Sequence, residues 1–352
     1  MIPKMKINIL TNKILWFGKY SGYECLTDYF SKDVSISLTI PRYVFFNKLV
    51  GKFLKLYLKW NKISHAQAFA EIRFLFKGKK HNISHILYLE NHLHVLSLFK
   101  KKKEYKLVGT IHFPFNHWDE EGLKSLTKLD TAIILYKEEV RNFANYIAID
   151  KIKVIKHGVD INFFKPGETV NVEKNKILFV GHFLRNFEMF YEVYQILEKK
   201  INEKLEYHFI IPTPHRHPAI LKKIAELPNT FFHEGLSDEE LLEFYQKSYV
   251  LLMPLDDSGA NTAIVQALAT GLPVITTDVG GIRSYGGNEI FPIVSNNASE
   301  EMAELFIKYY NDVEYRNRIA DKERQFAIDE LDWNLISAKH LNFYEETLKQ
   351  RD

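Results

Sequence analysis

The sequence is poor in cysteine and lacks a long apolar segment. Cys25 is the single cysteine of 352 residues, so no internal disulfide can form, which is typical of the reducing cytosol. No cysteine cluster offers a structural zinc site. The first residues contain no long apolar stretch, so we expect no secretory signal. The longest charge-free run, residues 258–277, contains glycine, asparagine, glutamine and proline. We therefore expect a helix, a turn and a buried strand there, and a cytoplasmic protein without a membrane-spanning helix.

Charge of each sign is concentrated in a different half of the chain, although the formal net charge is only +3. Residues 1–165 hold 28 Lys and Arg against 14 Asp and Glu, whereas the remaining residues hold 19 against 30. This asymmetry, in a chain long enough for two domains, predicts two domains that meet different partners. The basic half is expected to contact an anionic partner.

Acidic residues are absent from residues 34–70, where lysines follow the spacing of one helix face. The row consists of Lys48, Lys52, Lys55, Lys59 and Lys62, with aromatic residues such as Trp60 on other faces. A basic amphipathic helix of this kind suits an anionic membrane surface. We predict peripheral membrane contact through Lys48, Lys52, Lys55, Lys59 and Trp60. The alternative is a helix packed on its own sheet with solvated lysines. No nucleic-acid motif accompanies the row, so we expect no nucleic acid partner.

Short β-rich apolar runs alternate with longer helix-patterned runs along the whole chain. The expected strands lie in residues 8–10 with their flanks, 34–40, 85–90, 106–112, 131–136, 153–158, 176–182, 207–212, 230–235, 249–255 and 272–278. Such alternation predicts α/β architecture with two Rossmann-like, doubly wound domains, each binding ligands at the carboxyl ends of its strands. We place the N-terminal domain at 1–165 and the C-terminal domain at 166–330. Residues 331–352 are expected to form a helix that packs back toward the N-terminal domain.

Residues 258–269 follow a buried strand and open a helix. Ser258, Asn261 and Thr262 are residues that cap helices, and Gly259 would let a ligand approach the backbone. The free N–H groups and the positive end of such a helix attract phosphate. Any capped helix after a strand has a similar pattern, so this segment alone is weak evidence for a phosphate site.

The flanking segments resemble the family 4 glycosyltransferases, retaining enzymes of the GT-B fold. The resemblance rests on the 258–281 segment with its Asp278-Val279-Gly280-Gly281, on Leu178-Phe179-Val180-Gly181, on the loop and helix from Glu234 to Leu241, on His157-Gly158-Val159-Asp160, and on Thr110-Ile111-His112-Phe113-Pro114. It implies two domains facing a central cleft, with a nucleotide sugar bound by the second domain and an acceptor bound by the first.

The same resemblance implies the reaction and its requirements. It implies transfer of a sugar from a nucleoside diphosphate donor, with retention of configuration and without a metal or other cofactor. We favour a UDP-sugar over a GDP-sugar, and a glycan or lipid-linked acceptor in surface polysaccharide or glycolipid synthesis. Such an enzyme would work at the inner face of the cell membrane.

The resemblance also assigns residues to the site. Donor-binding roles fall on Gly18, Gly181, His182, Arg185, Thr213, Leu236, Ser258, Gly259, Ala260, Asn261, Thr262 and Gln266. Catalytic roles fall on His112, near the donor's anomeric carbon, and on Arg185, as a ligand of the diphosphate. Tyr20, Phe113 and Trp118 are candidate acceptor-binding residues, although a local hydrophobic cluster would use the same aromatic loop.

The chain departs from the family pattern at two glutamates that usually stand eight positions apart. Ser258 and Gln266 occupy those positions. Gln266 can still hydrogen-bond a ribose, but without the strength of a carboxylate. This departure keeps two alternatives open: a GT-B protein without activity that serves as a partner or scaffold, and a nucleotide-sugar epimerase of the same fold.

Overall fold

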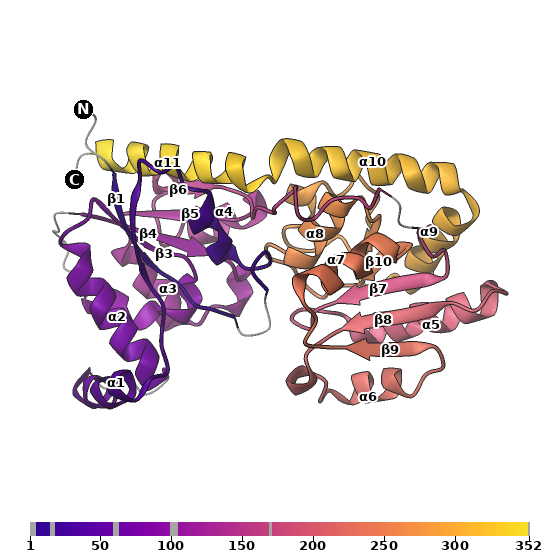
Figure 1. The fold of residues 1–352 in the computed structure, drawn as a ribbon, viewed down its shortest axis with the longest axis horizontal. Coiled ribbons are helices and arrows are strands. Elements are labelled where there is room, and N and C mark those ends of the chain that lie inside the picture. The colour runs from indigo at the N-terminus through magenta and orange to yellow at the C-terminus, as the bar shows by residue number, and fades with distance from the viewer. Residues whose placement is uncertain (1–4, 15–17, 59–62, 99–104, 169–170, 351–352) are drawn as a thin grey trace. The chain divides into compact units, whose positions relative to one another are not determined.

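The computed structural model describes residues 5–14, 18–58, 63–98, 105–168 and 171–350. The chain forms two compact units (Figure 1). The first unit comprises Met1–Leu15, Gly22–Ile155 and Asn334–Asp352, and the second comprises Trp16–Ser21 and Lys156–Trp333. The division after Ile155 lies upstream of the boundary at residue 165 that we expected.

Residues 156–165 belong to the second unit because their side chains and backbone contact it. The Tyr285 hydroxyl accepts the N–H of His157 at 2.8 Å. Gly158 lies so close to the Trp333 indole that a Cβ there would be 2.3 Å from the ring. Phe164 is fully buried and meets the Tyr245 ring edge to face. These contacts link residues far apart in the sequence, so local composition does not reveal them.

The first unit is built on a six-stranded parallel sheet of order β2-β1-β3-β4-β5-β6. Its strands are β1 (Lys6–Leu10), β2 (Ser35–Thr39), β3 (Ile83–Ile86), β4 (Lys106–Ile111), β5 (Thr131–Ile134) and β6 (Ile152–Val154). Every residue of β3 and β5 is buried. Strands of a parallel sheet are buried on both faces, so the polar residues of these two strands, Ser84, His85 and Thr131, are hydrogen-bonded.

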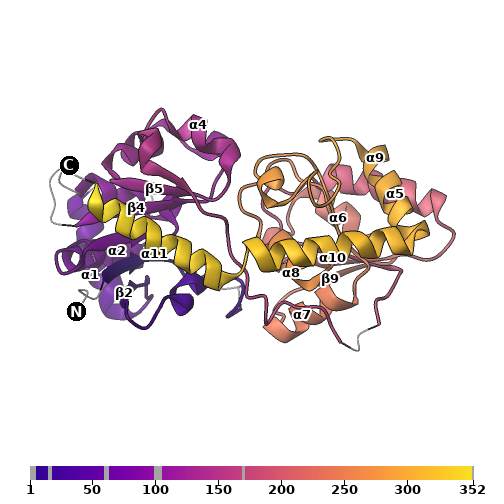
Figure 2. The same ribbon diagram turned by 90° about the horizontal axis from the view of Figure 1, so that it is seen from above.

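Helices cover both faces of this sheet. They are α1 (Phe45–Leu58), α2 (His65–Gly78), α3 (Glu120–Ser125), α4 (Val140–Phe143) and α11 (Trp333–Lys349). Asn8 of β1 bonds Ser84 of β3 and the Phe74 carbonyl of α2, whereas the next residue of β3, His85, bonds Tyr344 of α11. Because successive side chains of a strand point to opposite faces, α2 and α11 cover opposite faces of the sheet (Figure 2).

The second unit contains a five-stranded parallel sheet of order β11-β10-β7-β8-β9. Its strands are β7 (Lys176–Val180), β8 (Glu206–Ile210), β9 (Thr230–His233), β10 (Val250–Met253) and β11 (Val274–Thr276). Its helices are α5 (Phe187–Lys200), α6 (Ala219–Ala225), α7 (Asp238–Lys247), α8 (Thr262–Thr270), α9 (Ser299–Asn311) and α10 (Val313–Glu330).

Neighbouring residues of β8 show how helices cover this sheet too. The ring of Phe209 packs against Phe190 of α5, with centroids 4.8 Å apart, whereas His208 packs against Phe244 of α7 at 5.6 Å. Adjacent strand residues face opposite sides, so α5 and α7 lie on opposite faces. The prediction of two parallel-sheet α/β units is therefore confirmed.

Strand order locates the edge at which each unit would bind a ligand. In the second unit the order reverses between β7 and β10, and in the first it reverses between β1 and β3. Ligands of doubly wound sheets bind beyond the carboxyl ends of the strands at such switch points. The loops after β7 and β10 contain Gly181–Arg185 and Ser258–Asn261, two of the segments selected from the sequence.

The charge-free run 258–277 forms α8, a turn and β11, as predicted. Gly271 ends α8 with φ +66°, a left-handed conformation that glycine adopts at little cost. Among the described residues, no helix is both long enough and apolar enough to cross a membrane.

Candidate functional site

The loop after β7 brings a positive charge to the switch point of the second unit. β7 is followed by Gly181, which has φ +84°, and Leu184 also has a positive φ of 59°. Asn186 then caps α5 by accepting the N–H of Met189 at 2.9 Å. The tight path of the loop folds the side chain of Arg185 back over Gly181, where a Cβ would lie 2.8 Å from the guanidinium.

The Arg185 guanidinium is held by carbonyl and amide oxygens rather than by a carboxylate. Its N–H groups donate to the carbonyls of Val180 at 3.0 Å and Phe183 at 2.8 Å, and to Oδ1 of Asn261 at 3.4 Å. Burial lowers the pKa of Arg185 to about 10, so the group stays charged at neutral pH. Among the described residues, no carboxylate forms an ion pair with it. A half-buried cation without a counter-charge is a binding feature for an anion.

The start of α8 lies beside this cation. Asn261 caps the helix, and its Oδ1 accepts the N–H of Ile264 at 3.4 Å as well as the contact from Arg185. Ser258 is buried, and its hydroxyl donates to the Gly259 carbonyl at 2.9 Å. Its carbonyl accepts the N–H of Gly281 at 2.8 Å. The structure thus brings Arg185 together with the predicted donor-binding residues from Ser258 to Thr262.

The double glycine that follows β11 has a packing role in this arrangement. Gly280 has φ +48°, and a Cβ there would lie 2.0 Å from the Ser258 carbonyl oxygen. Only glycine permits this close approach of the two loops. The Asp278-Val279-Gly280-Gly281 motif therefore shapes the loop ahead of α8.

His182 and His215 form a stacked pair at the same edge. Their rings lie 3.6 Å apart with an interplanar angle of 6°. Burial first, and then the positive charge of neighbours including Arg185, lowers the pKa of His182 to about 4. His182 is therefore neutral at physiological pH and can both donate and accept a hydrogen bond. His215 was not among the predicted residues.

Two predicted donor-binding residues, Thr213 and Leu236, belong to loops after β8 and β9. The backbone N–H of Thr213 donates to Glu234 at 2.7 Å, and this contact lowers the pKa of the Glu234 carboxyl. Leu236 is half-buried and follows Gly235. Gly235 has φ +66°, and a Cβ added there would have no other atom within 4 Å.

Gln266 has both ends of its amide group engaged within the second unit. Its Oε1 accepts from the Tyr245 hydroxyl at 3.0 Å, and its Nε2 donates to the Ser21 hydroxyl at 2.9 Å. The side chain is buried. Tyr245 and Ser21 are partners that the sequence did not indicate.

Residues 18–21 group with the second unit and contact it through several atoms. The backbone N–H of Lys19 donates to Asp238 at 2.7 Å, and the Asp238 carboxylate fills the space beside the Cα of Gly18. The ring of Tyr20 stacks on Phe163 at 3.9 Å. Gly18 and Tyr20, predicted for donor and acceptor, thus serve the packing of this loop.

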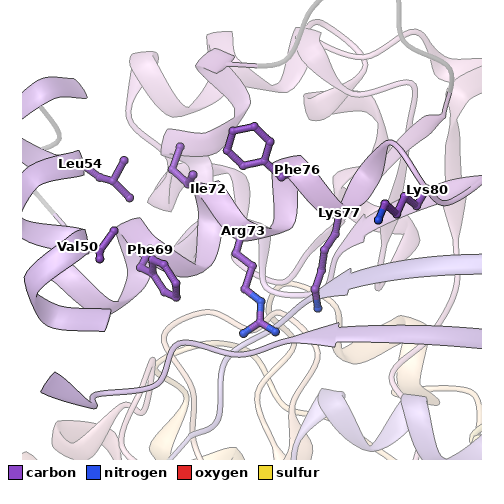
Figure 3. Close-up of a pocket in the computed structure, with 8 residues that line it drawn as sticks. All are labelled: Val50, Leu54, Phe69, Ile72, Arg73, Phe76, Lys77 and Lys80. Atoms are coloured by element: carbon purple, nitrogen blue, oxygen red, sulfur yellow. The ribbon is translucent and has the colours of Figure 1, made fainter. Parts of the chain in front are cut away.

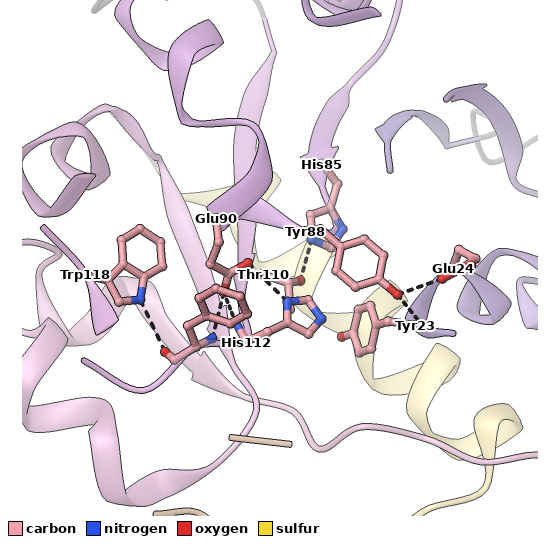
Figure 4. A network of polar contacts seen from close by, with 9 residues as sticks. Tyr23, Glu24, His85, Tyr88, Glu90, Thr110, His112 and Trp118 are labelled. Carbon is pink, nitrogen blue, oxygen red and sulfur yellow. Dashed lines mark hydrogen bonds and ion pairs between the residues drawn. The ribbon is translucent and has the colours of Figure 1, made fainter. Parts of the chain in front are cut away.

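His112 in the first unit directly follows β4 and is held by a carboxylate. Glu90 accepts the backbone N–H groups of His112 and Phe113, and its other oxygen lies 3.5 Å from Nδ1 of His112 (Figure 4). Both ring nitrogens of His112 are buried, and neither has a hydrogen-bond partner among the described residues. Unpaired buried polar groups are costly and are concentrated at functional sites.

Two tyrosines fix the plane of the His112 ring. Tyr88 stacks on it and Tyr23 meets it edge to face, each with centroids 4.8 Å away. The Tyr88 hydroxyl donates to Glu24 at 2.7 Å and accepts the N–H of Tyr23 at 2.8 Å. None of these residues was predicted. The signal available was position, because Tyr88 and Glu90 follow β3, the parallel neighbour of β4.

The aromatic loop after His112 packs on the core of the first unit. Trp118 meets the buried Phe143 edge to face at 5.8 Å, and its indole N–H donates to the Phe113 carbonyl at 3.3 Å. Phe115 packs on Phe143 as well. For Trp118 this packing is that of the local hydrophobic cluster that we gave as the alternative, and acceptor binding by Phe113 and Trp118 stays a prediction.

The predicted basic helix is present as α1. Lys48 and Lys52 are exposed on it, and Lys55 is half-buried. Lys59 and Trp60 lie outside the described residues.

Solved structures define the class of fold. The HepE protein of Anabaena in complex with UDP-glucose is similar to this chain with a TM-score of 0.72 and 12% identity, over 96% of this chain and 99% of that one. Sucrose-phosphate synthase from Thermosynechococcus elongatus has the same TM-score at 13% identity, over 97% and 98%. The fold is the two-domain GT-B architecture.

Sequence comparisons then identify the type of domain in the second unit. Residues 160–326 match the family described as "Glycosyl transferases group 1". The MMP alpha-(1->4)-mannosyltransferase of Mycolicibacterium hassiacum is 22% identical over 210 residues, which are 57% of this chain and 50% of that protein. The putative teichuronic acid biosynthesis glycosyltransferase TuaC of Bacillus subtilis is 25% identical over 24% of this chain and 22% of its own. The prediction of a glycosyltransferase is confirmed at the level of this domain, and the chain spans half or less of these curated relatives.

Proposed function

We propose that the chain is a retaining glycosyltransferase that moves a sugar from a nucleoside diphosphate donor to a glycan or lipid-linked acceptor. The observation that carries the proposal is the half-buried Arg185 charge, which has no carboxylate partner among the described residues and lies beside the start of α8. Retention of configuration rests on the family resemblance. A UDP-sugar is favoured because a structural neighbour was solved with UDP-glucose.

The chemistry needs stabilisation of the departing diphosphate. Cleavage of the bond to the anomeric carbon leaves negative charge on the diphosphate oxygens. Arg185 and the N–H groups at the start of α8 would meet this charge, in a site where burial strengthens electrostatic interactions. We propose that this arrangement acts without a divalent cation.

His112 would act on the sugar or the acceptor. Glu90 and Tyr88 hold its imidazole in place, and Nε2, which has no hydrogen-bond partner among the described residues, can donate or accept a hydrogen bond. The first unit would therefore present the acceptor. Its basic face, with Lys48 and Lys52 exposed, supports work at an anionic membrane surface in polysaccharide or glycolipid synthesis.

The experiment is a ligand screen followed by a transfer assay. UDP is expected to raise the melting temperature more than GDP, because a ligand that binds the folded state stabilises it. His112→Ala should then lower transfer by about 100-fold or more while UDP binding stays nearly intact. The control is His117→Ala, an exposed histidine in the same loop. Equal loss of binding and transfer in His112→Ala would contradict a role in catalysis.

A second candidate function is a GT-B protein without activity. It is favoured by Gln266, which replaces the usual glutamate and has both ends of its amide bonded to Tyr245 and Ser21. Absence of nucleoside diphosphate release with every common donor, in protein that binds UDP, would support this candidate. Conversion of the nucleotide sugar into an epimer without any acceptor would favour the epimerase, and release of free sugar to water would favour a hydrolase.

A further inference from the structure

Helix α1 leaves most of its apolar side chains uncovered. Of its residues only Gly51 is buried. Phe45, Leu56 and Tyr57 are 82%, 79% and 85% exposed, and the other exposed apolar residues of α1 are Phe46, Leu49 and Phe53. Contiguous exposed apolar surface of this kind marks a site of interaction with a protein or a membrane.

A groove of about 570 Å³ lies between α1 and α2. Val50 and Leu54 of α1 face Phe69 and Ile72 of α2 across it, and the groove is completed by Phe76, Arg73, Lys77 and Lys80 (Figure 3). Its walls are apolar, whereas Arg73, Lys77 and Lys80 supply positive charge along one helix and its end. The groove thus combines an apolar channel with cations at its rim.

Four cations of this surface have no acidic partner in the part of the chain that the structure describes. Residues 34–70 contain no Asp or Glu. Within the described ranges, no carboxylate forms an ion pair with Lys48, Lys52, Arg73 or Lys80. Lys77 donates to the Leu38 carbonyl and the Thr39 hydroxyl at 3.4 and 3.3 Å. Of the three basic residues that line the groove, Arg73 and Lys80 are the exposed ones. The charge on this surface is therefore available to an anionic ligand.

The combination favours a membrane phospholipid over a second copy of the chain. A symmetric dimer through α1 would bring the lysines of one copy against those of the other, and like charges brought together are destabilising. An anionic bilayer offers apolar chains and phosphates at once, and it matches a helix with apolar and basic faces.

We propose that the groove between α1 and α2 binds one acyl chain of an anionic membrane phospholipid, with the headgroup phosphate held by Arg73 and Lys80. The exposed apolar residues of α1 enter the interface beside it. This proposal rests on the membrane contact in the proposed function, and adds a defined lipid site to it.

A fluorescent label in the groove tests the proposal. In a Cys25→Ser background, Ile72→Cys carries the label, and Ile149→Cys, 63% exposed elsewhere in the first unit, is the control. Vesicles contain phosphatidylcholine and phosphatidylglycerol with brominated acyl chains. We expect strong quenching of the label at position 72 and none at 149. Bound protein without quenching at 72 would overturn the groove and leave membrane contact standing.

Charge reversal provides the second measurement. Arg73→Glu with Lys80→Glu should weaken partition onto phosphatidylglycerol vesicles by about 30-fold or more, since each basic residue contributes about 1 kcal/mol. The matched control is Lys128→Glu with Lys151→Glu. Equal weakening by both pairs of substitutions would overturn the assignment, because nonspecific electrostatic attraction to the vesicle would then explain the binding without a site at Arg73 and Lys80.

Further outcomes separate the groove from the proposed activity. A dimer in which the label at position 72 is shielded without lipid would assign the surface to a second copy and overturn the proposal. Failure to bind any vesicle would overturn both the groove and membrane contact. Vesicle binding and quenching in protein that never binds or cleaves a nucleotide sugar would support the groove and contradict the transferase.

Discussion

Arg185 illustrates how a single residue can carry a functional argument. Its guanidinium is half-buried and donates hydrogen bonds to the oxygens of Val180, Phe183 and Asn261. Removing a charged group from water costs several kcal/mol unless other interactions compensate for the lost hydration. Neutral oxygens compensate only in part, so a bound diphosphate would stabilise this arrangement.

Replacing Arg185 tests this role. Arg185→Gln should weaken UDP binding about 10- to 100-fold, because hydrogen bonds to charged groups contribute roughly 1.5–3 kcal/mol. Titration calorimetry with UDP measures the effect, and Arg318→Gln, an exposed arginine of α10, is the control. A lower melting temperature with unchanged UDP affinity would show that Arg185 only supports the loop.

Gln266 permits a nearly isosteric test of the missing carboxylate. Both of its partners, the hydroxyls of Tyr245 and Ser21, can donate to a carboxylate, so Gln266→Glu should fold normally. We expect UDP binding to be preserved or tightened, because a glutamate makes stronger hydrogen bonds to ribose. A large loss of affinity in calorimetry would show that Gln266 serves only the contact between Tyr245 and Ser21.

At the scale of elements, the sequence predicted which segments form strands better than it predicted which residues of neighbouring strands contact each other. The strand expected at 85–90 ends at Ile86, and Tyr88 and Glu90 beyond it reach His112. This contact exists because β3 and β4 are parallel neighbours with Ile86 opposite Gly109. Strand order is set by packing of the whole sheet, so the partners of His112 were not predictable from the motif around it.

Gly51 sets how closely α1 approaches α2. A Cβ at this position would lie 1.8 Å from the backbone oxygen of His65, which cannot move independently of its helix. Gly51→Ala should therefore separate the two helices and open the groove, despite the higher helix propensity of alanine. Limited proteolysis should cleave α1 faster than in the wild type. Unchanged protection would show that the helices adjust without separating.

At the scale of the whole molecule, buried histidines make stability depend on pH. Nδ1 of His340 is paired with the Ile336 carbonyl at 2.8 Å, so Nδ1 carries the proton and Nε2 accepts from the Tyr23 hydroxyl at 2.9 Å. Burial lowers the pKa of His340 to about 4, and burial also lowers the pKa of His85 well below its usual value. Both histidines are neutral in the folded chain at pH 7.

The stability of the first unit should fall on acidification. The unfolded histidines take up protons near pH 6.5, whereas folded His340 does so only near pH 4. The stabilisation is complete above pH 6.5 and is lost as the pH falls through 4, by at most about 1.4 kcal/mol per pH unit for each histidine. Urea unfolding across this range measures the slope. His340→Gln should reduce it, and an unchanged slope would contradict the assignment.

The extent of each unit could not be predicted from composition. The polar segment near residue 165 has the composition of a linker, yet Phe164 just before it is fully buried in the second unit. The boundary is instead set by contacts such as that between Gly158 and Trp333, which are distant in sequence. Periodicity predicted the elements, and distant pairings decided to which unit each belongs.

The position of α11 has a consequence for synthesis of the chain. The first unit takes Asn334–Asp352 as its last segment, and Thr347 of that segment bonds buried Thr131 at the start of β5. His85 likewise has its Tyr344 partner only when α11 is in place. Because α11 is synthesised after the second unit, the N-terminal sheet must wait, with one face open, until the second unit has been made. The order of domains along the chain is therefore the reverse of the order in which they can be completed.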